Sequence, residues 1–491
     1  MHRSTRVLRS LAPLATATAL VALAGCSSAD LSASDTGSDT AGSSSEGSSD
    51  DATAVAVGLA DDGFGAVGEL DSMTVHEIEV EFDEDDYASM LATYTATSEK
   101  EWIEATVTIA GTTFEQVGLR LKGNSSLRGV SADADPVDLP WLIRLDKFVD
   151  GQDLDGLTDL VVRSNNTETA LNEAVALELL EIAGLASQDA IAAAFSVNGS
   201  DATLRLVIEN PDDAWMAEWF DEDGALYKAE STGDYSYRGD DPDAYDEVFD
   251  QEAGEDNADL EPLMAFLAFI NEADDETFAS ELDEYLDVDA FATYLAMQDL
   301  IDNFDDIDGP GNNSYLYWDA DSGRFTVVPW DHNLAFGVQN GQAGGVAGRD
   351  GAQPGGVPGG PPADGALEGA PDGAPGEVTD GAQGGVPGAR PDIAGGAPTA
   401  DGAIPGPGQG GAAGAPNGSN VLAERFRSVD EFRALYEAQL DALSATLFDS
   451  GTADDVLTAW VDVVSSSGLI DPAVVDAESA SIAASTMGST G

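Results

Sequence analysis

Polar and apolar positions alternate along the N-terminal half of the chain. Residues 76–82 read His-Glu-Ile-Glu-Val-Glu-Phe, an alternation typical of a strand with one buried face. Further strand-like runs follow at 105–110, 116–121, 142–145 and 203–208. Between them, residues 169–182 carry apolar side chains at the spacing of one amphipathic helix. This half is therefore predicted to contain mainly strands, with one helix.

The second half has the three-to-four spacing of helices. The predicted helices cover residues 260–270, 276–286 and 289–301, and helical periodicity returns at 421–447. Two strand-like runs, 315–318 and 324–328, flank Asp-Ser-Gly at 321–323 and predict a β-hairpin. The pattern as a whole predicts an α+β fold.

The N-terminus has the features of an export signal. Three arginines among the first nine residues precede an apolar stretch at 11–24, and Leu-Ala-Gly-Cys follows at 23–26. This combination is typical of a lipoprotein signal peptide. We therefore expect residues 1–26 to direct export, Cys26 to be lipidated and the protein to be anchored outside the cytoplasm. No other apolar run reaches the length of a membrane span, so membrane contact is expected through this lipid only.

Two segments lack any periodic pattern. Residues 27–72 consist largely of Ser, Gly, Asp, Thr and Ala, and residues 338–419 largely of Gly, Ala, Pro, Asp and Gln. Such compositions bury too little apolar surface to offset the loss of chain entropy. We expect the first segment to be a flexible tether and the second to be a long disordered insertion within the domain.

Three short motifs follow one another near the middle of the chain. Asn-Phe-Asp at 303–305 ends in an acid, Asn313 stands at the predicted start of the hairpin, and Val-Pro-Trp-Asp at 328–331 supplies a second acid beyond it. Phosphoryl transfer requires a carboxylate that orients the attacking hydroxyl, then an amide and a carboxylate that hold Mg²⁺ against the nucleotide phosphates. Residues 303–337 are therefore the predicted active site.

These motifs resemble those of the CotH kinase family, secreted or spore-coat proteins with a reduced, atypical protein-kinase-like fold. Other stretches fit the same pattern in the same order: Leu-Arg-Leu-Lys-Gly-Asn-Ser-Ser at 119–126, Trp-Leu-Ile-Arg-Leu-Asp-Lys-Phe at 141–148, Leu-Asn-Glu at 171–173, Val-Asn-Gly at 197–199 and Gly-Ala-Leu-Tyr-Lys at 224–228, which closes the N-terminal half. The resemblance implies a two-lobed fold with a mixed β N-lobe and a mainly helical C-lobe. Its core spans residues 73–337, and residues 420–491 complete it with helices after the insertion.

The resemblance also implies roles for single residues. It places the catalytic carboxylate two residues after an asparagine, which selects Asp305. Asp308 is the alternative, because it lies five residues before Asn313, the separation in ordinary protein-kinase catalytic loops. The plain alternative for either is a solvated loop acid in a very acidic chain. Asn313 and Asp331 are the expected ligands of Mg²⁺, or of Mn²⁺, since Mg²⁺ prefers oxygen donors.

ATP is the expected cofactor, and its phosphates need a cation that a helix glutamate holds in place. Arg144 stands where the family's strand often has a lysine, with Glu173 or Glu178 as the helix partner. Glu209, at the end of a predicted strand, matches a family position near the nucleotide pocket. The expected nucleotide-binding residues are Lys122, Arg144, Glu173, Glu209 and Lys228.

The chain is strongly acidic, with 92 acidic and 19 basic residues and a formal charge of −73. This charge repels nucleic acid and anionic membranes, and it serves either solubility by self-repulsion or the attraction of a basic partner. Cys26 is the single cysteine, so disulfides within the chain and thiolate metal sites are excluded. The chain has four lysines, three of them inside the segments that resemble the family.

These features together predict a lipid-anchored protein kinase that transfers the γ-phosphoryl group of ATP to Ser or Thr of an extracytoplasmic, spore-surface or cell-surface protein. The charge and the location favour a basic or Ser-rich acceptor. The alternative is a non-catalytic surface protein that keeps the kinase-like fold for adhesion or assembly, because nucleotide triphosphate is scarce outside a cell. A cation-binding surface protein that uses the same acidic loop is a third hypothesis.

Overall fold

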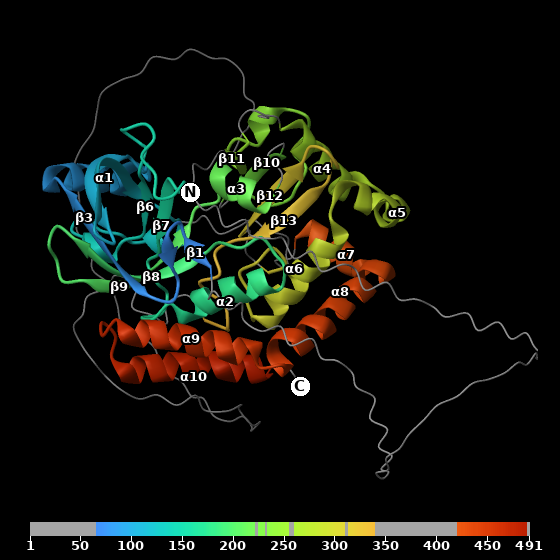
Figure 1. Ribbon diagram of the computed structural model, residues 1–491. Helices are drawn as coiled ribbons and strands as arrows, with labels where there is room; N and C mark the ends of the chain where they lie inside the picture. Colours follow the sequence, from blue (N-terminus) through green and yellow to red (C-terminus); the bar gives the residue numbers. More distant parts are fainter. Residues whose placement is uncertain are drawn as a thin grey trace, which may run out of the picture. The chain divides into compact units, whose positions relative to one another are not determined.

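The computed structural model describes residues 65–220, 224–230, 233–254, 260–309, 313–338 and 420–488, with side chains up to residue 486. The expected signal peptide with Cys26, the tether up to residue 64 and the insertion from residue 339 to 419 lie outside the described residues. Within them, strands and helices form the predicted α+β fold (Figure 1). The described helices include none that is both long and apolar enough to span a bilayer.

Seven strands close into a barrel in the order β3-β4-β5-β6-β7-β9-β8. They are β3 (Val75–Phe82), β4 (Ile103–Ile109), β5 (Thr112–Leu121), β6 (Trp141–Arg144), β7 (Asp159–Val162), β8 (Ala190–Val197) and β9 (Thr203–Glu209). β3 and β8 pair in parallel, whereas the other neighbours pair antiparallel. The N-terminal half is therefore the mixed β-structure that was predicted.

Side chains of each barrel strand alternate between the interior and the outer face. On β5, Val117, Leu119 and Leu121 are buried in the cluster that fills the barrel. Because side chains alternate along a strand, Arg120 points outward, and Lys122 continues this outer row just beyond the strand. One strand thus contributes both to the core and to a row of cations on the outside of the barrel.

A second sheet has the strand order β11-β10-β12-β13. Its strands are β10 (Gly224–Ala229), β11 (Phe249–Ala253), β12 (Ser314–Asp319) and β13 (Phe325–Pro329). β12 and β13 form the predicted hairpin, whose turn includes Gly323 with a φ of 72° that glycine adopts at little cost. The segment 224–228, which the sequence suggested as the close of the N-terminal half, is not part of the barrel. It lies in the middle of this second sheet, because its backbone pairs with both β11 and β12.

Helices make up most of the remaining described chain. They are α1 (Glu84–Thr97), α2 (Leu171–Ile182), α3 (Asp213–Trp219), α4 (Glu261–Glu272), α5 (Asp275–Tyr285), α6 (Val288–Leu300), α7 (Val421–Ser428), α8 (Asp430–Leu443), α9 (Thr452–Ser466) and α10 (Pro472–Gly488). A π-helical turn, Ser444–Asp449, follows α8 directly. The region after residue 420 is helical, as predicted, and α9 and α10 lie beyond the stretch of helical periodicity at 421–447.

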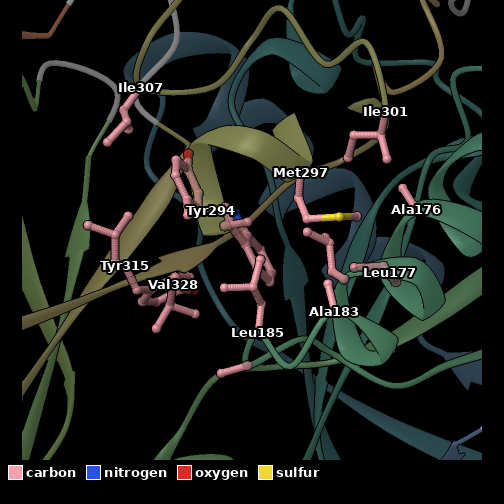
Figure 2. Packing of buried hydrophobic residues seen from close by; sticks show 14 of the residues in the cluster. Ala176, Leu177, Ala183, Leu185, Tyr294, Met297, Ile301, Ile307, Tyr315 and Val328 are labelled. Carbon is pink, nitrogen blue, oxygen red and sulfur yellow. The ribbon is translucent and has the colours of Figure 1, made fainter. Parts of the chain in front are cut away.

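α6 is a buried helix of the larger hydrophobic core. It begins after Asp287, whose side chain accepts a hydrogen bond from the Ala290 amide and so caps the helix. Figure 2 shows Tyr294 and Met297 of α6 among core side chains that include Leu177 of α2 and Tyr315 of β12. Because α6 is packed on several sides, the position of the loop that follows it is well defined.

The folded part begins before the predicted boundary at Met73. β1 (Ala66–Val67) pairs with β2 (Leu70–Asp71), and Val67 and Leu70 are buried. The amide of Ala66 donates a hydrogen bond to Asp189 Oδ2 at 3.0 Å. The tether assignment was wrong for residues 65–72, because the partners that bury them lie far away in the sequence.

Candidate active site

The end of α6 and the β12-β13 hairpin bring the predicted acids and amide together. The loop after α6 carries Asp305, while Asn313 precedes β12 and Asp331 follows β13. Asn313 Nδ2 donates hydrogen bonds to the backbone oxygen of Asp305 at 2.9 Å and to its Oδ2 at 3.1 Å. Burial raises the pKa of Asp305, and the negative charge of Asp331 raises it further. The structure therefore places Asp305 and Asn313 in direct contact, with Asp331 close enough for its charge to act on Asp305.

Buried amides anchor the loop that carries Asp305. Asn303, 5% exposed, donates from Nδ2 to Gln298 Oε1 at 2.7 Å. Gln298 Nε2 lies 3.1 Å from His332 Nε2, which links α6 to the residue after Asp331. Burial lowers the pKa of His332 to about 4, so this histidine is neutral at neutral pH. His332 therefore acts as a buried polar link between α6 and the segment after β13.

Asp331 has an uncommon backbone conformation, with a φ of 61°. A non-glycine residue in this region carries strain that the surrounding structure must hold in place. Shortly afterwards, the amide of Phe336 donates to the Ile301 oxygen at 2.5 Å and that of Gly337 to the Asp302 oxygen at 3.1 Å. These two hydrogen bonds join the segment after Asp331 to the loop after α6. The chain segments that carry Asp305 and Asp331 are therefore directly connected.

Arg163, which the sequence analysis missed, holds two carboxylates from distant parts of the chain. It follows β7, and its Nε donates to Glu173 Oε2 at 3.0 Å while its Nη2 lies 2.8 Å from Glu173 Oε1. The same Nη2 donates to Asp331 Oδ1. Burial alone would lower the pKa of Arg163, but Asp331 and Glu173 outweigh it and raise this pKa. Burial raises the pKa of Glu173, with Arg163 opposing.

The glutamate-bound cation is therefore Arg163 and not Arg144. Arg144 forms a two-pronged ion pair with Asp159, with Nε 2.7 Å from Oδ1. The two residues are direct cross-strand partners in the β6-β7 register, which makes this pair a local one. Glu173 is the helix partner, as predicted, because it lies in the first turn of α2 close to the end of β7. A charged residue directly after a short apolar run was the only sequence signal for Arg163.

Lys122 lies at the edge of the same site. Its Nζ donates to Asn210 Oδ1 at 2.9 Å and lies 5.8 Å from the centre of the Trp330 ring. Burial lowers the pKa of Lys122 to about 8, with Glu252 opposing and Lys228 adding to the effect. Trp330 is 7% exposed and belongs to the core. The Arg163 guanidinium also lies near this ring, 6.0 Å from its centre.

The other two predicted nucleotide-binding residues have protein partners. Lys228 Nζ, on β10, lies 2.8 Å from Glu230 Oε1. Glu209, at the end of β9, is 6% exposed and accepts a hydrogen bond from the Asp189 amide at 3.0 Å. Lys228 is close enough to Lys122 to influence its pKa, whereas the contact seen for Glu209 supports the barrel.

Asp308 has a different environment from Asp305. Its Oδ2 lies 2.5 Å from Nη1 of Arg427, a residue of α7. Burial raises the pKa of Asp308 and Arg427 opposes this change. Asp305, by contrast, contacts Asn313 and is influenced by Asp331 and by Arg128 in the loop after β5. The geometry thus separates the two alternatives, with Asp305 beside the hairpin residues and Asp308 in an ion pair with the C-terminal segment.

The donor set fits a hard divalent cation. Asn313 donates from Nδ2 to Asp305, so its side-chain oxygen is the atom that can bind a cation. Asp331 has a second carboxylate oxygen beside the one that accepts from Arg163. A cation between Asp305 and Asp331 would relieve their mutual repulsion. Among the described residues, no three or more His, Cys, Asp or Glu side chains are placed so that they could hold a metal ion by themselves. Mg²⁺ needs only one or two protein carboxylates when phosphates and water complete its shell.

Comparisons with known proteins identify the family. The family model described as CotH kinase protein matches residues 119–472, well over half of the chain. The chain is also 26% identical over 168 residues to the inner spore coat protein H of Bacillus subtilis (strain 168). That match covers 33% of this chain and 45% of the relative, so it spans less than half of the relative's length. The range that the family model matches includes the hairpin, Arg163 and α2. The chain belongs to the CotH kinase protein family.

Proposed function

We propose that this protein is a kinase that transfers the γ-phosphoryl group of ATP to Ser or Thr hydroxyls of an extracytoplasmic or surface protein. The observation that carries the proposal is the joint placement of Asp305, Asn313 and Asp331, with Asp331 held by the Arg163–Glu173 pair. In protein kinases a cation–glutamate ion pair and a metal-binding aspartate must both be in place for transfer. The fold would then be a two-lobed, kinase-like one, with the barrel as one lobe and the α6-hairpin region in the other.

Each group has a distinct task in this proposal. Asp305 accepts the hydrogen bond of the acceptor hydroxyl, and its raised pKa makes it a better base than an exposed aspartate. Asn313 and Asp331 hold the metal ion, which neutralises charge on the transferring phosphoryl group when it is bound. Arg163 and Lys122 supply positive charge on the barrel side of the site. Lys228 adds to this charge from β10, and Arg144 stays with Asp159.

The cellular setting is part of the proposal. The export signal and the lipid on Cys26 would place the enzyme outside the cytoplasm, attached to the membrane by the lipid only. The acidic surface supports a basic or Ser-rich acceptor, because opposite charge speeds encounter and favours correct partners. Nucleic acid is not expected as a partner, for the same electrostatic reason.

Phosphate transfer from labelled ATP to the protein itself and to a basic, Ser-rich peptide is the direct test, with Mg²⁺ or Mn²⁺ present. The variants Asp305→Asn and Asp331→Asn remove one charge each at nearly constant volume, and Asp302→Asn is the matched control in the same loop. Transfer that disappears in both site variants and persists in the control supports the proposal. A folded protein that neither binds nor turns over nucleotide would instead favour the non-catalytic surface protein.

A further inference from the structure

The C-terminal helix α10 contacts the turn that begins α2. Glu478 Oε1 accepts a hydrogen bond from the Glu168 amide at 3.0 Å, and its Oε2 accepts from the Thr169 amide at 3.0 Å and from the Thr169 hydroxyl at 2.5 Å. Thr169 is 3% exposed, so water does not readily replace these bonds. α10 begins at residue 472, where the family match ends. The contact therefore comes from a part of the chain that the family match does not cover.

This turn determines how α2 starts. Ala170, the residue before the helix, has a φ of 54°, which is unfavourable for a residue with a side chain. The Thr169 hydroxyl accepts from the Leu171 amide at 3.2 Å, and the Thr167 hydroxyl accepts from the Ala170 amide at 3.0 Å. Glu478 thus accepts from the backbone amides of residues 168 and 169, while the Thr167 and Thr169 hydroxyls accept from the next two amides of the chain, at the start of α2. A carboxylate is also favourable at this end of a helix because of the helix dipole.

The first turn of α2 carries two residues that reach the active site. Asn172 Nδ2 donates to the Asn333 backbone oxygen at 2.7 Å, and Glu173 binds Arg163, which holds Asp331. Each residue of a helix is rotated by roughly 100° from the one before. A change in where α2 begins would therefore swing Glu173 away from Arg163. One continuous set of bonds leads from Glu478 to Asp331.

Helix packing supports the same contact. α9 packs along α2, and α10 packs on both α9 and α2 (Figure 1). Val475 and Ile482 of α10 are buried in the larger core, and they lie on either side of Glu478 along the helix. The apolar face of α10 thus holds the helix in place while Glu478 contacts the turn.

We propose that Glu478 is a positioning residue. It holds the start of α2 in place and thereby, through Glu173 and Arg163, the position of the Asp331 carboxylate. Its effect on catalysis rests on the proposed kinase function. The C-terminal helix then makes the geometry of the site depend on the last segment of the chain. Phosphoryl transfer is sensitive to small displacements, because a shift of about 1 Å in a reacting group costs roughly 100-fold in rate.

The test compares Glu478→Gln with Asp476→Asn, an exposed acid on the same helix, in the full chain. Glutamine keeps the shape, but it replaces one of the two acceptor oxygens by an NH2 group that then faces a backbone N–H donor. We expect amide hydrogen exchange of residues 168–173 to rise roughly tenfold or more in Glu478→Gln and to stay unchanged in Asp476→Asn. We also expect kcat to fall by roughly tenfold or more while the KM for ATP changes little.

Variants of Thr169 provide a second part of the same experiment. Thr169→Ala removes the hydroxyl bond to Glu478 but leaves the two amide bonds, so it should raise exchange less than Glu478→Gln, and Thr169→Ser should restore wild-type exchange and kcat. Because the hydroxyl bond involves both residues, the double variant should change exchange by less than the sum of the two single variants. Unchanged exchange in Glu478→Gln, or raised exchange with wild-type kcat, would overturn the inference. If the wild-type protein transfers no phosphate, the proposed function has failed, and the exchange comparison alone decides whether Glu478 holds α2.

Discussion

Arg163 is the residue on which the site depends most, because one buried guanidinium holds Glu173 and Asp331 together. Removing one partner of a buried ion pair leaves an uncompensated charge and costs about 3–5 kcal/mol. We expect Arg163→Met to lower the free energy of unfolding by about this amount at pH 7, as measured by urea denaturation. The double variant Arg163→Met/Glu173→Gln should recover part of the loss. A loss below about 1 kcal/mol in the single variant would contradict the buried pair.

Asp306 gives the protein a pH-dependent stability. It is 5% exposed, accepts from the Gly309 amide at 2.9 Å, and burial raises its pKa to about 7. Because the folded pKa lies above that of an unfolded aspartate, this residue's contribution is fully present below about pH 4 and is lost as the pH rises through about 7.

We therefore expect Asp306→Asn to be more stable than the wild type at pH 8, by roughly 2–4 kcal/mol, and no more stable at pH 4. Urea unfolding at the two pH values measures the difference. Asp321→Asn, at the exposed hairpin turn, is the control and should show no such pH dependence. Equal stability of wild type and Asp306→Asn at pH 8 would show that Asp306 is ionised without penalty in the folded protein.

At the scale of elements, α7 joins the end of α6 to the loop that carries the catalytic candidates. Arg427 of α7 lies 3.1 Å from Asp299 of α6 and 2.5 Å from Asp308. Its neighbour Arg425 instead donates to the Ile270 and Ala273 backbone oxygens at 2.8 Å, at the end of α4. α7 thus contacts the core through Arg425 and the loop after α6 through Arg427.

This arrangement separates a positioning role from a catalytic one. We expect Asp308→Asn and Arg427→Gln to lower phosphate transfer by roughly tenfold, because they loosen the loop, whereas Asp305→Asn should lower it by roughly 100-fold or more. Arg425→Gln is the matched control and should leave transfer nearly unchanged per folded molecule. A larger loss in Asp308→Asn than in Asp305→Asn would make Asp308 the catalytic acid.

At the scale of the whole molecule, the formal charge of −73 works against the folded state. Self-repulsion of a compact, highly charged chain destabilises it, and salt screens this repulsion, with a Debye length of about 10 Å at 0.1 M. We expect Tm to rise by several degrees, roughly 5 °C, between low salt and 0.5 M NaCl at pH 7.5. The rise should shrink near pH 4, where carboxylates become protonated. A Tm independent of salt at pH 7.5 would mean that the charges are already neutralised locally.

Much of the fold was predictable from local pattern. The alternation at 76–82 corresponds to β3, which has one buried face, and the spacing of apolar residues at 289–301 corresponds to α6, which is buried on several sides. β7 and β8 were missed, since they are buried on nearly all sides and alanine or short apolar runs replace alternation. The sequence predicted helical structure after residue 420, but it did not predict α9 and α10 as two separate helices. The many small residues of α10 give it little contrast between faces, whereas α9 has a clear buried face that includes Trp460.

The sequence by itself determined the α+β class, the family and the acids and amide of the site, since Asp305, Asn313 and Asp331 lie on either side of one hairpin whose turn chemistry is local. Tertiary structure alone decided their environment. It paired Glu173 with Arg163 instead of Arg144, put Asp308 in an ion pair with α7, and brought Glu478 to the start of α2. The contacts of Asp308 and Glu478 join segments more than a hundred residues apart, and strand register pairs Arg144 with Asp159, so no local pattern of residues encodes which charge meets which.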